Sequence, residues 1–311
     1  MSSTILVTGP ELAPEAQAIL LESGAALDFV PERSSEDALA ARLARGDVVA
    51  IMMRGSPPFT RRVLGSAKGL RIIAKVGSGL DSVDTRTAGE LGIMLTTSAV
   101  ATADGVAEHT LALMLSLARD LPRLDKSTRA GHWEQRNFGG HEFRSRTVGV
   151  VGYGHIGQRV ARLVDAFGAT VLVHPLTTPR KVEHGTLEEN FDRLLRTVDI
   201  LTLHGRLTEK TRGQIGRREL ALMKPSAILI NTARGALVEE AALIEALSTG
   251  KLAAAGLDAF AKEPLDRANP LLALPNVICT SHVAAAARET VVRVATMAAR
   301  SIVEHLKGHS N

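Results

Sequence analysis

The stretch Val148-Gly149-Val150-Val151-Gly152-Tyr153-Gly154-His155-Ile156-Gly157 is an apolar run that breaks into the pattern G-x-G-x-x-G. The apolar run predicts a buried parallel strand. The first glycine of the pattern allows a tight turn, the second lets the backbone approach a pyrophosphate, and the third lets the next helix pack close to the strand. A helix over about residues 154–167 and a strand over Thr170–His174 complete a βαβ unit. In this context the pattern predicts a dinucleotide site, with the phosphates at the positive N-terminus of the helix.

About half of the 311-residue chain precedes this motif, so length and motif position together indicate two domains. Short apolar runs alternate with Ala- and Leu-rich helical stretches in both parts, which predicts an α/β chain with parallel sheets covered by helices. The predicted strands are Ile5–Val7, Leu27–Val30, Val48–Met53, Arg71–Val76, Ile93–Thr96, Thr170–His174, Asp199–His204, Ala227–Asn231, Ala254–Leu257 and Val277–Thr280. Long helices are predicted over Ala103–Arg119 and Ala285–Leu306, and a polar stretch rich in Arg, Gly and His, Arg129–Arg146, follows the first of them.

The composition and the charge pattern argue against nucleic acid and membrane as binding partners. The formal net charge of +4 is small for this length, and the Lys and Arg residues are scattered, which is typical of a solvated surface and not of a nucleic-acid footprint. No stretch approaches the ~18 apolar residues of a membrane helix, and no metal is expected. The single Cys279 lies in an apolar run and indicates a buried structural thiol. The chain begins directly with a predicted strand and no apolar leader, so a cytoplasmic location is expected.

Polar residues follow three predicted strands of the nucleotide-binding part. Arg234 comes after the strand Ala227–Asn231, Glu263 after Ala254–Leu257, and His282 after Val277–Thr280. Each alone has an ordinary interpretation, as a helix cap, a loop charge or a surface histidine. Because ligands of open α/β sheets bind beyond the carboxyl ends of the strands, the three together predict a reaction site.

Six motifs are specific when they occur as a set: Lys75-Val76-Gly77-Ser78-Gly79-Leu80-Asp81, Val106-Ala107-Glu108-His109-Thr110, Val151–Gly157, Asn231-Thr232-Ala233-Arg234-Gly235, Leu257–Leu265 and Ser281-His282-Val283-Ala284. With them the chain resembles the D-isomer-specific 2-hydroxyacid dehydrogenases over nearly its whole length. Formate dehydrogenases of the same superfamily usually carry Gln where this chain has Glu263, which argues against that branch.

The resemblance implies two doubly wound parallel-sheet domains. A Rossmann-type NAD(P)-binding domain of about residues 99–285 would be inserted into a flavodoxin-like substrate domain formed by residues 1–98 and 286–311, with the reaction in the cleft between them. It also implies a homodimer formed through the cofactor domain around the helix after Ala103. Glu108 and His109 are therefore interpreted as helix-packing or dimer contacts. No regulatory domain is expected after the last helix.

The same resemblance assigns roles at the reacting centre. His282 would exchange the proton, Glu263 would hydrogen-bond the other imidazole nitrogen, and Arg234 would hold the substrate carboxylate and polarise the carbonyl. The backbone N–H groups of Ser78 and Gly79 would complete the carboxylate cradle, although glycine there also fits a plain turn. Arg54 could recognise a second anionic group such as a phosphate, or could be a surface arginine.

Cofactor contacts are carried over by position. Gly152, Gly154, His155, Ile156 and Gly157 would line the pyrophosphate; Thr232, Ala233 and Asp258 would lie beside the nicotinamide, and Gly205 on the adenosine side. NAD-preferring relatives usually end the second strand with an Asp that repels a 2′-phosphate, and here that position is His174. Arg180 and Lys181 follow, and Arg206 stands where a Pro is usual. NAD is expected as cofactor, with NADP an open alternative.

The expected function is hydride transfer between a nicotinamide cofactor and a D-2-hydroxyacid/2-oxoacid pair. The pair could be of the 3-phosphoglycerate, glycerate/hydroxypyruvate or glycolate/glyoxylate type, because the sequence does not separate them. One alternative is other chemistry on the same fold, which the set Arg234, Glu263 and His282 argues against. The second is a non-catalytic dinucleotide sensor resembling the dehydrogenase-like corepressors, which can keep the same residues.

Overall fold

The computed structural model describes residues 3–136, 138–177 and 181–308, and the chain folds into two compact units. Unit 1 consists of Met1–Thr102 and Ala285–Asn311, and unit 2 of Ala103–Ala284. The chain thus leaves unit 1 to build unit 2 and then returns. The substrate and cofactor roles assigned to the two parts stay predictions.

Unit 1 is built on a five-stranded sheet in the order β2-β1-β3-β4-β5, with every neighbouring pair parallel. This is the order of the flavodoxin-like doubly wound fold. Its strands are β1 (Thr4–Thr8), β2 (Ala26–Val30), β3 (Val48–Met53), β4 (Ile72–Lys75) and β5 (Met94–Thr97). Its helices are α1 (Pro14–Leu21), α2 (Glu36–Leu43), α3 (Arg61–Ser66), α4 (Thr85–Glu90) and α11 (Arg288–Gly308).

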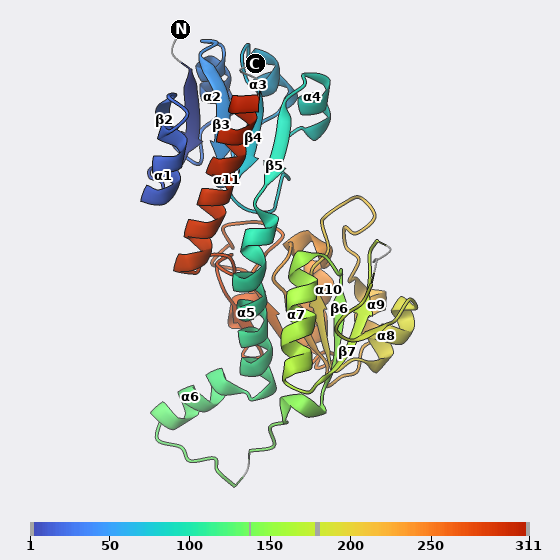
Figure 1. Cartoon of the computed structure of the whole chain (residues 1–311). Helices are drawn as coiled ribbons and strands as arrows, with labels where there is room; N and C mark the ends of the chain where they lie inside the picture. The colour runs from blue at the N-terminus through green and yellow to red at the C-terminus, as the bar shows by residue number, and fades with distance from the viewer. Residues whose placement is uncertain (1–2, 137, 178–180, 309–311) are drawn as a thin grey trace. The chain divides into compact units, whose positions relative to one another are not determined.

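Two apolar layers sandwich this sheet. Leu20 of α1 packs with Ala298 and Ile302 of α11 on one face, whereas α2, α3 and α4 cover the other. Figure 1 shows α1 and α11 side by side although they come from opposite ends of the chain. Every residue of β1 and β4 is buried, which explains why their central runs, Ile5–Val7 and Ile72–Ala74, are continuously apolar and do not alternate.

Unit 2 is built on a seven-stranded parallel sheet in the order β12-β11-β10-β9-β6-β7-β8. Seen from β6, the strands that follow along the chain are placed on both of its sides, which is the doubly wound arrangement of Rossmann-type folds. The strands are β6 (Thr147–Val151), β7 (Thr170–His174), β8 (Thr186–Leu187), β9 (Ile200–Leu203), β10 (Ile228–Asn231), β11 (Ala254–Leu257) and β12 (Val277–Cys279). The fold class expected from the sequence is confirmed.

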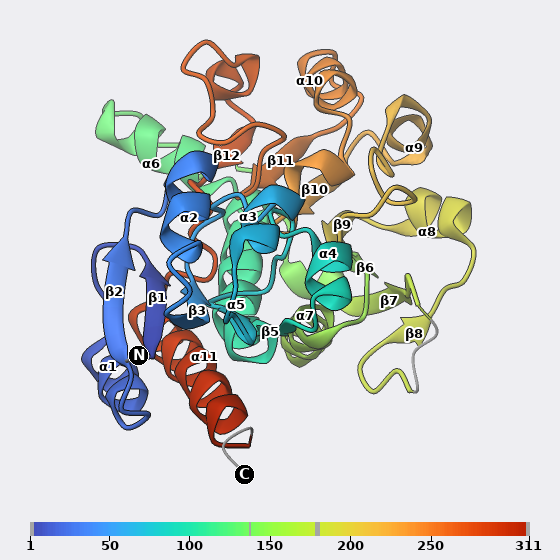
Figure 2. The same cartoon turned by 90° about the horizontal axis from the view of Figure 1, so that it is seen from above.

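The helices of unit 2 form two layers on opposite faces of this sheet. Residues of α5 (Ala99–Ala118) and α7 (His155–Ala166) pack on one face, and residues of α8 (Phe191–Thr197), α9 (Arg217–Leu222) and α10 (Glu240–Ser248) on the other. Figure 2 shows α8, α9 and α10 together at the far side of β9 and β10 from α5 and α7. Short 3-10 turns lie at Phe143–Ser145, Gly235–Leu237 and Pro270–Ala273.

Several elements differ from expectation. Two were not expected: α6 (Leu121–Arg129), which ends at the start of the polar stretch, and β8. α5 begins at Ala99, four residues before the predicted start at Ala103. The last helix begins at Arg288, three residues later than predicted. Most residues of α6 are charged or polar, with leucine only at Leu121 and Leu124, and none is buried, so its sequence carries little of the apolar signal on which helix prediction depends. β8 has only two residues, both exposed, and carries no alternation.

Candidate active site

The glycine turn after β6 lies at the switch point of the sheet, where β6 neighbours both β7 and β9. Gly152 has a φ of +93°, and a Cβ there would lie 2.9 Å from the backbone of both His204 and Gly205, which follow β9. Only glycine allows the loops after β6 and β9 to approach this closely. The crevice in which a dinucleotide binds in doubly wound folds is at this point.

The other two glycines of the motif have distinct roles. A Cβ on Gly157 would lie 2.0 Å from the carbonyl oxygen of Gly152, so glycine is required for α7 to pack against the turn. A Cβ on Gly154, the N-cap of α7, would meet no atom within 4 Å. The space beside Gly154 and the N–H groups at the start of α7 therefore fit a pyrophosphate. His155 is exposed and Ile156 half-buried in that first turn.

His174 ends β7, and its Nδ1 is 2.9 Å from the carbonyl oxygen of Glu188. Since a carbonyl only accepts, His174 Nδ1 carries the proton and Nε2 is left as an acceptor. The imidazole ring packs against Phe191 with centroids 4.9 Å apart. Arg206 and Lys181 are exposed, whereas Arg180 lies outside the residues that the structure describes.

Arg234 is presented by a loop that Asn231 holds in shape. The buried Asn231 side chain donates to the carbonyl of Arg234 (2.9 Å) and accepts from the N–H of Ala233 (3.1 Å). A Cβ on Gly235 would lie 1.9 Å from the carbonyl carbon of Phe260, so the loop after β10 touches the loop after β11. Gly235 thereby holds Arg234 and Glu263 on adjoining loops. No role was predicted for Gly235 from the sequence.

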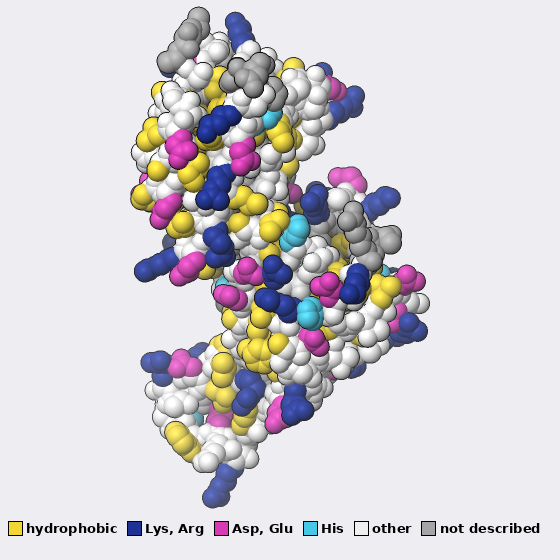
Figure 3. Space-filling view, in the orientation of Figure 1, with side chains coloured by type: hydrophobic (Ala, Val, Ile, Leu, Met, Phe, Trp, Pro, Cys, Tyr) yellow, Lys and Arg dark blue, Asp and Glu magenta, His cyan; other side chains and the backbone are white. Residues whose placement is uncertain are grey.

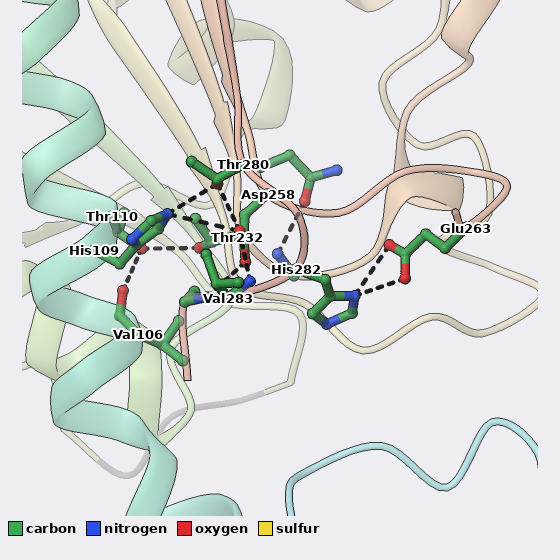
Figure 4. A network of polar contacts seen from close by, with 12 residues as sticks. Val106, His109, Thr110, Thr232, Asp258, Glu263, Thr280, His282 and Val283 are labelled. Carbon is green, nitrogen blue, oxygen red and sulfur yellow. Dashed lines mark hydrogen bonds and ion pairs between the residues drawn. The ribbon is translucent and has the colours of Figure 1, made fainter. Parts of the chain in front are cut away.

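Glu263 and His282 form an ion pair. His282 Nδ1 lies 3.0 Å and 2.8 Å from the two Glu263 carboxylate oxygens (Figure 4). A carboxylate accepts, so Nδ1 carries the proton and Nε2 is the nitrogen left for a ligand. The hydrogen bond from Glu263 raises the pKa of His282 against the opposing effect of burial. Burial raises the pKa of Glu263, but His282, the Phe260 N–H and Arg234 together lower it further.

Asp258 is hydrogen-bonded to the segment that carries His282. Its side chain is fully buried, and its carboxylate accepts from the N–H groups of Val283 and Ala284, each at 2.9 Å, and from the Thr280 hydroxyl at 2.6 Å. These bonds fix the chain on both sides of His282, whose φ is +57°. These hydrogen bonds hold Asp258 beside the acid–base pair, and its predicted place beside the nicotinamide stays a prediction.

Thr232 contacts the long helix α5. Thr110 Oγ1 donates to the carbonyl of Val106 (2.7 Å) and lies 2.8 Å from Thr232 Oγ1. A hydroxyl has one proton, so Thr232 donates to Thr110 and retains only acceptor capacity. The neighbouring Ala233 is half-buried, and its carbonyl accepts from Arg234 Nη1 at 2.7 Å.

Three of the predicted substrate residues, Arg54, Ser78 and Gly79, lie in unit 1 on loops after β3 and β4, whereas Arg234 belongs to unit 2. Arg54 donates to the carbonyl of Glu11 and lies 3.7 Å from the Glu32 carboxylate, and 29% of its side chain is exposed. Ser78 is exposed and Gly79 half-buried in the bend after β4. Their assignment as substrate contacts stays a prediction.

The doubly wound sheet, the glycine turn at its switch point and the ion pair at neighbouring strand ends together define a dinucleotide-binding α/β protein with an acid–base group beside the site. A family model described as D-isomer specific 2-hydroxyacid dehydrogenase, NAD binding domain, matches residues 111–284. The chain therefore belongs to the D-isomer specific 2-hydroxyacid dehydrogenase family.

Relatives with curated names carry several activities. A D-3-phosphoglycerate dehydrogenase from Archaeoglobus fulgidus is 37% identical over 292 residues, which cover 91% of this chain and 55% of the relative. A glyoxylate reductase from Aeropyrum pernix is 41% identical over 255 residues, covering 79% of this chain and 76% of the relative. The chain spans about half the length of the phosphoglycerate dehydrogenases that it matches.

Solved structures agree with the fold. The crystal structure of a glyoxylate reductase from Paecilomyes thermophila has a TM-score of 0.87 at 31% identity, covering 97% of this chain and 96% of the other. That of an NADPH-dependent glyoxylate/hydroxypyruvate reductase from Sinorhizobium meliloti, in complex with NADP and malonate, has a TM-score of 0.82 at 30% identity, covering 97% and 93%. Among the described residues no helix is long and apolar enough to cross a membrane.

Proposed function

We propose that this protein transfers a hydride between a nicotinamide cofactor and a D-2-hydroxyacid/2-oxoacid pair. The observation that carries the proposal is the pairing of His282 with Glu263 at 2.8 Å, at the strand ends of a dinucleotide-binding sheet. Arg234 follows the adjacent strand, and its charge acts on both members of the pair. An acid–base group and a fixed cation at one sheet edge are what reduction of a 2-oxoacid requires.

The roles follow from the geometry. When bound, the nicotinamide cofactor supplies or takes up the hydride. Because Glu263 holds the Nδ1 proton of His282, Nε2 is the atom that gives a proton to the carbonyl oxygen in reduction and takes it back in oxidation. Arg234 is permanently charged, so its planar fork suits the substrate carboxylate. Thr232, with only acceptor capacity left, suits an amide N–H of the nicotinamide.

The substrate belongs to one of three types: 3-phosphoglycerate, glycerate/hydroxypyruvate or glycolate/glyoxylate. The chain's relatives carry names from these activities. In the structure Glu32 lies beside Arg54 and offsets its charge, which makes a phosphate contact by Arg54 less favourable. We therefore place the non-phosphorylated 2-oxoacids first.

The experiment is oxidation of NADH and of NADPH by the purified protein with glyoxylate, hydroxypyruvate, phosphohydroxypyruvate and pyruvate, in parallel with the His282→Ala variant. Turnover by the wild type and a loss of roughly 10²- to 10⁴-fold in the variant, with cofactor affinity unchanged, is the expected result. Cofactor binding without turnover of any 2-oxoacid would contradict the proposal and favour a dinucleotide sensor.

We propose NAD as the preferred cofactor. His174 Nδ1 donates to the carbonyl of Glu188, and the buried Glu188 carboxylate, paired with Arg193, keeps a negative charge near this strand end. His174 Nε2 can accept a hydrogen bond from a ribose hydroxyl but does not repel a 2′-phosphate as an aspartate would. The kcat/KM for NADH divided by that for NADPH tests this preference. The variant His174→Asp should have a higher value of this ratio than the wild type.

We propose a homodimer in the cytoplasm. No residue of α6 is buried, Leu121 is 51% exposed and Trp133 80% exposed, and a cavity of about 560 Å³ lies between the ends of α5 and β12. A second copy would cover the exposed side chains of Leu121 and Trp133. Sedimentation equilibrium should give twice the chain mass, and Leu121→Glu with Trp133→Glu should give monomers; a monomeric wild type would contradict the proposal.

A further inference from the structure

A chain of hydrogen bonds runs from α5 to the segment that carries His282. His109 Nε2 lies 3.0 Å from Thr280 Oγ1 and 3.7 Å from Asp258 Oδ1. Thr280 Oγ1 donates to Asp258 Oδ1 at 2.6 Å. Figure 4 shows the His109 ring reaching from α5 toward Thr280 and Asp258, with His282 on the other side of Asp258.

The protons along this chain can be assigned. Thr280 gives its only hydroxyl proton to Asp258, so its oxygen accepts from His109. His109 Nε2 therefore carries a proton. Asp258 in turn accepts from the N–H groups of Val283 and Ala284. The direction of donation is thus the same at each step, from His109 through Thr280 to the carboxylate beneath His282.

The chain secures a backbone conformation that is not favourable by itself. His282 has a φ of +57°, which lies in the left-handed region that residues other than glycine rarely adopt. Asp258 compensates by bonding to Thr280 before this residue and to Val283 and Ala284 after it. A carboxylate that turned away would release both sides of His282 together.

We propose that His109 and Thr280 are positioning residues for the acid–base histidine: they orient the buried Asp258 carboxylate, which sets the backbone and the ring position of His282. The inference rests on the proposed function for its kinetic meaning. It gives His109 a role other than helix packing or a subunit contact. Both residues act through Asp258 and need not touch the substrate.

Because Asp258 is charged, its orientation affects the pKa of His282, and this pKa distinguishes a positioning role from a role in packing alone. Three charged groups act on His282: Glu263 and Asp258 raise its pKa, whereas Arg234 lowers it. If Asp258 loses its orientation, its contribution falls and the pKa of His282 decreases. Histidine titration followed by NMR measures this directly, and it requires no turnover.

Thr280→Val keeps the shape of the side chain and removes the hydroxyl, while Thr280→Ser keeps the hydroxyl. His109→Leu removes the donor, while His109→Gln keeps an N–H donor at a similar reach. Thr249→Val is the matched control, because it removes a hydroxyl that bonds to the carbonyl of Glu245 in α10. All five are compared with the wild type in kcat, KM, cofactor affinity and the pKa of His282.

Thr280→Val and His109→Leu should lower kcat by roughly 10- to 100-fold. Cofactor affinity should stay unchanged, and the pKa of His282 should fall. Thr280→Ser and His109→Gln should recover most of the activity, and Thr249→Val should match the wild type. Wild-type kcat and His282 pKa in Thr280→Val and His109→Leu would overturn the inference, as would a loss in His109→Gln equal to that in His109→Leu.

The experiments distinguish a failure of the proposed function from a failure of the positioning role of His109 and Thr280. If the wild type reduces no 2-oxoacid, the proposed function fails, but the fall in the pKa of His282 still tests the positioning chain. If Thr280→Val does not fold, the comparison of His109→Leu with His109→Gln decides alone. His109 is on a helix and 24% of its side chain is exposed, so both substitutions are compatible with folding.

Discussion

Arg234, Glu263 and His282 were predicted from one consideration, that polar residues after parallel strands meet at one sheet edge. The structure brings Glu263 and His282 into contact and places Arg234 on the adjoining loop. Their catalytic roles stay predictions. The sequence could not indicate Gly235 or Thr280, because their importance lies in contacts with loops distant along the chain. His109 belongs to one of the six sequence motifs, but the sequence does not show that its side chain points toward Thr280, because that depends on how α5 packs in unit 2.

Replacing Glu263 by Gln should shift the pH dependence of reduction. The Glu263 carboxylate raises the pKa of His282, and a neutral amide cannot, so the imidazolium would form only at lower pH. Reduction needs that proton, and hence the pH above which kcat falls should move to lower values. A pH–rate profile checks this, with the exposed Glu304→Gln as control. An unmoved profile would show that the pair does not govern proton transfer.

Gly235→Ala should separate the loops that carry Arg234 and Glu263. The added Cβ would lie 1.9 Å from the Phe260 carbonyl carbon, so the backbone must shift, and displacement of about 1 Å can cost roughly 100-fold in kcat. Gly89→Ala is the control: its Cβ meets nothing within 4 Å, and in α4 it should stabilise by about 0.5–1 kcal/mol. Kinetics and thermal unfolding of both variants measure the difference. Equal behaviour would contradict the close approach.

At the scale of elements, the turn and helix after β6 should respond differently to two alanine substitutions. Gly154→Ala adds a methyl group where the protein has no atom within 4 Å, so the fold should persist while the cofactor binds more weakly. Gly157→Ala places Cβ 2.0 Å from the Gly152 oxygen, so both stability and cofactor affinity should fall. Calorimetry and fluorescence titration separate the two effects. Unchanged cofactor affinity in Gly154→Ala would exclude this turn as the pyrophosphate site.

Elements with a continuous apolar run were predicted within a few residues of their observed bounds. β10, for example, covers Ile228–Asn231 against a predicted Ala227–Asn231. Burial on both faces of a parallel sheet leaves such runs in the sequence. α6 left no such signal, because none of its residues is buried within the chain. The pattern of apolar residues does not reveal an element that buries none of its side chains fully.

At the scale of the molecule, the two units could be predicted because the alternation of strands and helices restarts after the glycine motif. Lys and Arg side chains are interspersed with Asp and Glu over the face shown in Figure 3. The scattering of charge was visible in the sequence. The substrate was not, because Arg54 acquires its neighbour Glu32 only through the packing of unit 1.

Cofactor binding should stabilise the whole protein and protect a defined part of it. A ligand at 100 times its dissociation constant adds about 2.7 kcal/mol to the free energy of unfolding. Hydrogen exchange with and without NAD should show increased protection at residues 152–157 and 204–205, the two loops that meet at the switch point. Protection confined to other loops of unit 2 would place the dinucleotide elsewhere.

Arg234, Glu263, His282, Asp258 and the glycine turn all belong to the single stretch Ala103–Ala284. Three residues predicted to contact the substrate, Arg54, Ser78 and Gly79, belong to the other unit. Substitutions in unit 1 can therefore change the predicted substrate contacts while the sequence that carries the acid–base pair and the glycine turn stays the same.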